Sequence, residues 1–306
     1  MTPWRVAWCL IPLGLAFAAQ DRSTLSILAL AAVQALYAAS WDLAGGVSGR
    51  PTLGHALPLG TGAYAAALVS GWGLAPPPLA VAGGALAGGL IGALQGSLVA
   101  RLRPVSVALV TLATAECGHE ISRMVRFLWP GGITVGGDSG VPAFVYPPGE
   151  AAAARLAATA LAAGLIGLVW IAHSAPGLAM RTVRADERLA AASGIDVARV
   201  RMLALTIAGT TAGLAGGLLA SLVGRASPSM LALDSSLFAM AAGGVGGLGS
   251  IIGPATVAYA AAAAFQWLDI SGPVRLAVYA LLLIGSGLAP SARAALGGTR
   301  QRRAGK

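Results

Sequence analysis

Charged residues are scarce in this sequence. Of its 306 residues, 20 are Lys or Arg and 11 are Asp or Glu, so the charged fraction is 10%, whereas soluble domains carry about 25%. Hydrophobic residues reach 57%, and 43 glycines add to them. Too little polar surface remains for a soluble or disordered chain. The composition therefore predicts an integral membrane protein.

Lysine and cysteine are nearly absent. The one lysine, Lys306, is the last residue of the sequence, so there is no Gly-x-x-x-x-Gly-Lys-Ser/Thr phosphate-binding loop, and any ATP-driven role needs a separate subunit. Cys9 and Cys117 both lie in apolar stretches, which excludes a disulfide framework and a paired-cysteine metal site. We expect no metal, no cofactor and no catalytic residue.

Hydrophobic segments recur along the whole chain. They predict an all-α polytopic helix bundle of about 8–10 membrane segments in one domain over residues 1–306, with 1–23 as an N-terminal anchor helix. A full crossing needs about 20 mostly apolar residues, so the shorter segments 53–70, 234–248 and 250–268 are expected to be broken or re-entrant helices. The other candidate segments are 4–19, 24–45, 79–100, 104–128, 152–173, 202–223 and 274–290.

The distribution of positive charge predicts the orientation. The net charge of +9 is concentrated between apolar segments, which is typical of cytoplasmic membrane loops and not of a nucleic-acid surface. Fourteen of the 20 basic residues fall in segments that would face the same side of the membrane. They include Arg50 and the basic residues of the loop 176–201 and of the tail 291–306. Both termini are therefore predicted to be cytoplasmic and the loop 129–151 external. The six remaining basic residues are Arg22, Arg123, Arg126, Arg155, Arg225 and Arg275.

Glycine is arranged in two regular patterns. Two stripes at a spacing of four predict close packing of helices within the bundle. A weak internal repeat places Gly45–Gly49 and Gly243–Gly247 at corresponding positions of two halves, which is typical of helices broken around a transport site. The stripes are Gly84, Gly88, Gly92 and Gly96, and Gly209, Gly213 and Gly217.

Two other glycine motifs suggest enzymes. Residues 244–249 match a dinucleotide fingerprint, but apolar segments flank it where a βαβ unit would be required, so a hinge between two short helices is the better interpretation. Residues 46–49 resemble the Gly-x-Ser-Gly of rhomboid-type intramembrane serine proteases, with Ser48 as nucleophile and His173 as a candidate base. Nothing else in the sequence supports this remote alternative.

Ionisable residues within an apolar segment are costly and usually face the bundle interior or a cavity. Glu116, His119 and Glu120 share one segment with Arg123, which can reach both His119 and Glu120 along a helix. The group either lines a pathway or forms an ion-pair cluster between helices. It provides too few ligands for a metal site.

The loop 176–201 contains the sharpest local signal. Residues 184–195 predict a short helix, because Asp186 and Glu187 suit a first turn, alanines follow them, and Gly194 can end it. The small apolar face of such a helix, lying outside the lipid, is suited to a groove on a partner protein.

At this point a family resemblance emerges. Residues 187–195 resemble the Glu-Ala-Ala…Gly loop of ABC-importer permeases, and three further motifs resemble the branched-chain amino acid permease family, a type-II importer branch. The resemblance extends from about residue 28 to 290, with the motifs in the family's order. These motifs lie at Gly49–Tyr64, Val110–Glu116 and Gly243–Pro254.

The resemblance implies an inner-membrane permease that forms a heterodimer with a sister permease and binds two cytoplasmic ATPase subunits and an extracytoplasmic binding protein. It also implies that this chain has a coupling helix that docks on the ATPase. Other residues would lie near the translocation path, and glycines would act as hinges at the helix breaks. The coupling residues are Arg184, Asp186, Glu187, Ala190, Gly194 and Ile195; the path residues are Thr52, His55, Thr111 and Glu116; the hinges are Gly49, Gly54, Gly244, Gly247 and Gly249.

The sequence departs from the family pattern at the first break and at the outer loop. Pro58 replaces a Phe, Thr52 replaces a Ser, Arg50-Pro51 replaces more neutral residues, and residues 136–140 have an exchanged order. The expected solute is a branched-chain or similar small amino acid, with urea, short amides or sugars as alternatives. An ATP-independent secondary transporter is a further alternative.

Overall fold

The computed structural model describes residues 12–285, except 13, 131, 145, 146, 148, 271 and 273. Most of the predicted anchor helix 1–23 lies outside the described residues, as do the basic tail 291–306 and both termini.

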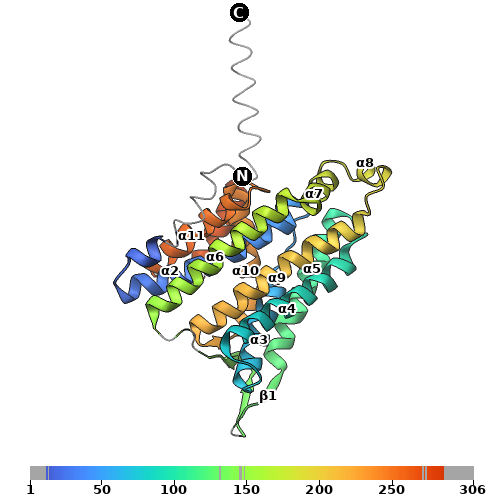
Figure 1. The fold of residues 1–306 in the computed structure, drawn as a ribbon. Coiled ribbons are helices and arrows are strands. Elements are labelled where there is room, and N and C mark those ends of the chain that lie inside the picture. The colour runs from blue at the N-terminus through green and yellow to red at the C-terminus, as the bar shows by residue number, and fades with distance from the viewer. Residues whose placement is uncertain are drawn as a thin grey trace, which may run out of the picture.

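The described chain is a helical bundle with only short strands, which confirms the all-α class (Figure 1). The main helices are α2 (Arg22–Asp42), η1 (Leu43–Val47), α3 (Ala56–Gly71), α4 (Pro77–Val99), α5 (Pro104–Met124), α6 (Glu150–His173), α7 (Ala175–Ala185), α8 (Glu187–Ala192), α9 (Val197–Val223), α10 (Leu233–Gly246) and α11 (Ile252–Trp267). The remaining elements are β1 (Arg126–Leu128), β2 (Thr134–Gly136), η2 (Gly137–Ser139), β3 (Val141–Pro142), β4 (Arg225–Ala226) and η3 (Pro228–Leu231).

Four helices are long and apolar enough to cross a membrane: α2 continued through η1, α4, α6 and α9. The three segments predicted to be short are α3, α10 and α11, with 16, 14 and 16 residues. At a rise of 1.5 Å per residue they extend about 21–24 Å, less than the roughly 30 Å of a hydrocarbon core. The chain is therefore a multi-pass membrane protein that combines long helices with short ones.

The bundle has two different ends. Helices α7 and α8 lie at one end, called the α8 end, and the antiparallel pairs β1–β2 and β3–β4 lie at the other, called the hairpin end (Figure 1). Arg126 and Arg225, which the charge pattern assigned to the external side, belong to β1 and β4 at the hairpin end.

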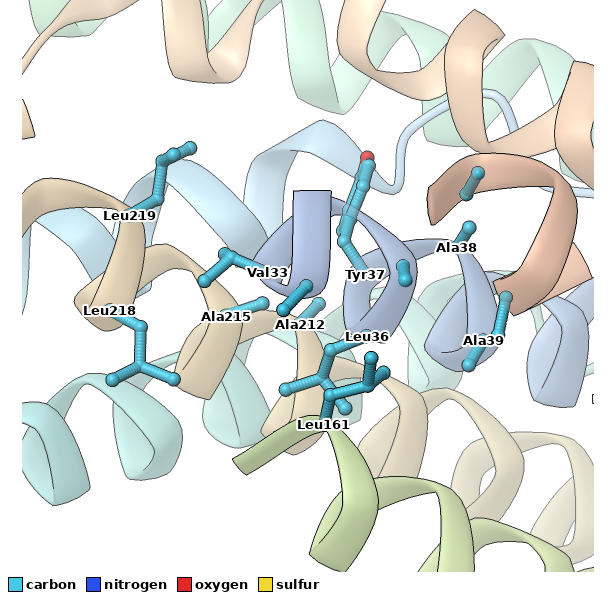
Figure 2. Close-up of a cluster of buried hydrophobic side chains, with 14 of the residues drawn as sticks. Val33, Leu36, Tyr37, Ala38, Ala39, Leu161, Ala212, Ala215, Leu218 and Leu219 are labelled. Carbon is cyan, nitrogen blue, oxygen red and sulfur yellow. The ribbon is translucent and has the colours of Figure 1, made fainter. Parts of the chain in front are cut away.

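Helix α2 forms the centre of the bundle. Leu36 and Tyr37 are fully buried, and α2 packs against α6, α9, α10 and α11. Figure 2 shows part of this core, in which Leu36 of α2 lies beside Leu161 of α6 and Val33 of α2 lies beside Ala215 of α9. A helix surrounded by protein on all sides can carry polar groups that lipid would not tolerate.

The two glycine stripes pack against each other, one on α4 and one on α9. A methyl group added at Gly88 would lie 2.6 Å from Gly213 Cα and would overlap the backbone of α9. Small residues allow this approach of two backbones in a membrane, where no hydrophobic force brings helices together. The predicted close packing within the bundle is confirmed.

We expect Gly88→Val to destabilise the protein by about 1–3 kcal/mol, because the added side chain forces α4 away from α9. The measurement is thermal unfolding of the purified protein in detergent. Gly83→Val on the same helix is the matched control, since no atom lies within 4 Å of the position of its added Cβ. Equal melting temperatures for the two variants would contradict the packing described here.

Candidate functional site

The first helix break lies between η1 and α3, at residues 48–55. Its backbone groups have no helical partners, and side chains from other helices supply them. Trp41 Nε1 of α2 donates to Thr52 O at 2.9 Å, and Thr111 Oγ1 of α5 accepts from Leu53 N at 3.3 Å. Such partners are required because lipid offers none.

Two more helices hold the same break. Gln95 Nε2 of α4 donates to Gly54 O at 3.2 Å, and Ser236 Oγ of α10 accepts from Ala56 N at 2.9 Å. Gly54 has no room for a side chain, since an added Cβ would overlap Thr111 O. The break is therefore a fixed junction of α2, α4, α5 and α10.

The structure brings together three of the four predicted path residues, Thr52, His55 and Thr111, all of them buried. His55 Nε2 lies 2.8 Å from Ser40 Oγ, and its ring stacks on Tyr37 with centroids 5.2 Å apart. Thr52 Oγ1 has no hydrogen-bond partner among the described atoms and borders a cavity of about 10 Å³. The space is about that of one water molecule.

The fourth predicted path residue, Glu116, is half-buried on α5 and belongs to a separate polar group. Arg123 contacts Glu120 at 3.3 Å, as predicted, and also Asp138 of η2 at 2.7 Å. His119 Nδ1 lies 2.9 Å from Pro228 O. Arg123 and His119 therefore fasten α5 to neighbouring segments, whereas the contact between Arg123 and Glu120 lies within α5.

The second break lies between α10 and α11, at residues 247–251. Gly247 and Gly249 have φ values of +90° and +85°, which favour glycine. The carboxylate of Asp42, fully buried on α2, accepts from Gly249 N at 2.8 Å and from Ile251 N at 2.8 Å. It thus holds the turn that leads into α11, beside the N-terminal end of that helix, where an acidic group is favourable.

The two breaks touch each other. Gly46 in η1 lies so close to Gly249 that an added Cβ would overlap Gly249 N and Asp42 Oδ1. Gly46 belongs to the first repeat segment, Gly45–Gly49, while Gly249 lies two residues beyond the second, Gly243–Gly247. Of the predicted hinges, Gly49 also has a positive φ of +80°, while Gly244 is an ordinary residue of α10.

The predicted helix at 184–195 is two helices. Asp186 is extended, with φ −154° and ψ 111°, so α7 ends at Ala185 and α8 begins at Glu187. The Asp186 carboxylate accepts from Arg188 N at 2.8 Å and from Leu189 N at 3.0 Å, which makes it the N-cap of α8. Gly194, with φ +82°, follows the end of α8 as predicted.

Arg184, at the end of α7, reaches the first break. Its Nη1 donates to Gly46 O, and the stem of its side chain fills the space beside Gly49. An added Cβ at Gly249 would lie 2.6 Å from the same Nη1. One side chain therefore joins α7 to the point where the two breaks meet.

Glu187 of α8 forms a second link. Its Oε2 lies 2.6 Å from Arg50 Nη2 and 2.5 Å from Arg201 Nη2. The two guanidinium groups also donate to carbonyls of the α4–α5 turn, Arg50 to Leu102 O and Arg201 to Ala100 O. We call Arg50, Glu187 and Arg201 the triad; it joins α8, the first break, the α4–α5 turn and the start of α9.

The triad sets the protonation of its carboxyl group. Partial burial opposes ionisation, but hydrogen bonds and positive charge from Arg201 and Arg50 outweigh it and hold the pKa of Glu187 below its usual value. The contribution of this carboxylate to the stability of the folded protein is thus complete at pH values above the ordinary pKa of a glutamate. It is lost as the pH falls through the lowered value.

The remaining surface of α8 faces outward. Leu189 is 64% exposed, and Ala192 and Gly194 are also exposed. Ala190 is fully buried and Ile195 is half-buried, so these two predicted coupling residues fix α8 to the bundle from within.

The described residues offer little for chemistry. Among them, no group of three His, Cys, Asp or Glu side chains could hold a metal ion. Ser48 Oγ donates to Ala44 O, and His173 Nδ1 lies 2.8 Å from Val169 O. The serine and the histidine thus each bond within their own helical segment, and their hydrogen bonds give no nucleophile–base pair.

A family model described as the permease component of branched-chain amino acid transport systems matches residues 23–286. The matched region begins in α2 and includes both breaks, the triad and α8. No curated protein and no solved structure matches the chain.

Asp42→Ala is expected to destabilise the protein by about 2–5 kcal/mol, because it leaves the buried N–H of Ile251 and the half-buried N–H of Gly249 without an acceptor. Hydrogen exchange at Gly249 and Ile251 should become faster, and Asp42→Asn, which keeps one acceptor oxygen, should lose less. Asp196→Ala is the control, since Asp196 caps the exposed start of α9 and is worth about 1 kcal/mol. Unchanged exchange at Gly249 in Asp42→Ala would contradict this account.

Proposed function

Because the chain belongs to the permease-component family of branched-chain amino acid transport systems, we propose that it forms the translocation path of an ABC importer driven by separate ATPase subunits. The solute proposed is a branched-chain or similar small amino acid. Membership of this family supports the role of a transport subunit. A sister permease and an extracytoplasmic binding protein complete the proposed assembly.

One observation carries the proposal of ATPase coupling: an exposed short helix is joined by charged side chains to both helix breaks. Helix α8 presents Leu189 to the outside, the triad joins Glu187 to Arg50 beside the first break, and Arg184 reaches Gly46 where the breaks meet. A partner that moves α8 would therefore also move the breaks.

The proposed mechanism uses these links as a lever. ATP binding in the partner shifts α8, and Arg184 and the triad transmit the shift to the glycine turns of the two breaks. The short helices α3, α10 and α11 then reorient, and the path opens alternately to each side of the membrane. The chain's own residues bind and transmit, and the hydrolysis of ATP takes place elsewhere.

The proposed orientation places the α8 end in the cytoplasm of a bacterial-type inner membrane. Exposed arginines at this end support it, since cytoplasmic loops carry the excess of positive charge. These arginines are Arg101, Arg181, Arg188 and Arg199. The cytoplasmic position of both termini remains part of this proposal.

Reconstitution tests the proposal against a secondary transporter. The chain would be purified with its native partners, incorporated into liposomes, and assayed for leucine uptake with and without ATP and the binding protein. Uptake that needs both is the expected result. Uptake at the same rate without nucleotide would overturn the ATP-driven mechanism, and competition by urea, acetamide or a sugar but not by valine would overturn the proposed solute class.

Variants of the triad should separate ATP hydrolysis from transport. Arg201→Gln removes a charged hydrogen bond to Glu187, a loss of about 1–2 kcal/mol at this half-exposed carboxylate. We expect leucine uptake to fall about tenfold, while the complex keeps its basal ATPase activity but loses stimulation by the loaded binding protein.

Arg199→Gln is the matched control two residues away. Arg199 is 85% exposed and pairs only along its own helix with Asp196, so uptake should stay near that of the unmodified complex. If Arg199→Gln and Arg201→Gln impaired uptake equally, general surface charge and not the triad would be responsible.

Ser48→Ala distinguishes a permease from a serine protease. The serine hydroxyl bonds only to the preceding helical turn, so its loss should change uptake by less than about twofold. The measurement is ATP-driven leucine uptake beside cleavage of a membrane-protein substrate. Proteolysis that disappears in Ser48→Ala would support the protease alternative.

A further inference from the structure

A second polar cavity lies away from the breaks and the triad. It has a volume of about 190 Å³ and is bordered by α2, the start of α10, the end of α11 and the helix at Val274–Gly285. The start of α10 follows β4 and η3, so the cavity belongs to the hairpin end. Drug-sized ligands occupy about 300–1,000 Å³, so this cavity suits a smaller molecule.

Two opposite charges border the cavity without pairing to each other. Asp234 and Arg275 both contribute to its wall, yet neither forms an ion pair among the residues that the structure describes. Arg275 is held by backbone carbonyls, with its Nε donating to Ile270 O at 2.8 Å. Asp234 Oδ1 accepts from the adjacent Ser235 N at 2.9 Å.

Asp234 is exposed and Arg275 is half-buried, so both charged groups are accessible to a ligand in the cavity. A ligand with one positive and one negative group, placed between the carboxylate and the guanidinium, would satisfy both. Gln34 and Gln266, which also border the cavity, can donate or accept further hydrogen bonds.

The rest of the wall is aromatic. Tyr279 contacts Phe238 at 5.4 Å and Phe265 at 5.7 Å between ring centroids. These rings provide an apolar side beside the two charges, as an aliphatic side chain requires. The combination fits a small zwitterion with an apolar group attached.

We propose that this cavity binds a free amino acid with an apolar side chain, its carboxylate at Arg275 and its ammonium group at Asp234. This inference rests on the proposed function and adds to it a binding site within one permease chain at the external end. The same ammonium-and-anion chemistry occurs in the phosphatidylethanolamine headgroup, so the test must separate the two sources.

The test is equilibrium binding of radiolabelled leucine to the purified complex in detergent free of phosphatidylethanolamine, without ATP or binding protein. Asp234→Asn and Arg275→Gln should each weaken binding about tenfold or more. The controls Glu150→Gln and Arg155→Gln likewise neutralise one acidic and one basic residue at another cavity of the hairpin end and should bind leucine unchanged.

Competition on the unmodified complex gives a readout that does not depend on the folding of a variant. Unlabelled leucine should displace the probe, while leucinamide, which lacks the carboxylate, and 4-methylpentanoate, which lacks the ammonium group, should not. Displacement by both single-charge analogues would overturn the proposal. If phosphatidylethanolamine displaced the radiolabelled leucine at a lower concentration than unlabelled leucine does, the cavity would be assigned to lipid.

Uptake measured on the same preparations separates this proposal from the importer. ATP-driven leucine import by a complex that shows no leucine binding in the cavity would overturn the amino-acid site and leave the importer standing. Binding that follows the expected pattern in a complex without ATP-driven import would support the site and overturn the importer.

Discussion

The need to satisfy every backbone group inside the protein determines this structure. In lipid, a helix can stop only where other parts of the chain replace the missing hydrogen bonds. Both breaks meet this condition: Asp42 accepts from Gly249 and Ile251, and side chains such as Gln95 and Ser236 serve residues 54–56. These contacts tie α2, α4, α5 and α10 together at one level of the bundle. Each break is therefore held by several helices, so a movement of a break is passed on to those helices.

Close packing makes those hydrogen bonds geometrically feasible. Short side chains such as Ser236 reach the backbone of another helix only where helices approach closely, and glycine allows that approach between α4 and α9 and between Gly46 and Gly249. The same closeness makes the α8 end responsive to a partner. The single side chain of Arg184 reaches from α7 to both breaks. A displacement of α7 and α8 therefore cannot leave the glycine turns unaffected.

The sequence predicted those features that depend on periodicity and composition. The helical class, the short segments, the packing role of the glycine stripes and the end of α8 near Gly194 all follow from local patterns. The role of Asp42 did not, because its partners lie more than 200 positions away; a lone acid in an apolar stretch was the available signal. The division at Asp186 was also missed, since Asp186 suits an N-cap and a first turn alike. The Asp234–Arg275 cavity depends on how four helices converge, which no local pattern records.

Helix α2 connects the two ends of the molecule. Gln34 borders the cavity of the hairpin end, Tyr37 and Ser40 contact His55 at the first break, and Asp42 holds the second. From Gln34 to Asp42 the helix rises about 12 Å. A buried helix in contact with four others cannot bend easily, so a change at the cavity and a change at the breaks must be accommodated by the same rigid element. Solute at the external end and a partner at the α8 end would thus act on one helix, which gives the two sites a physical route for coupling.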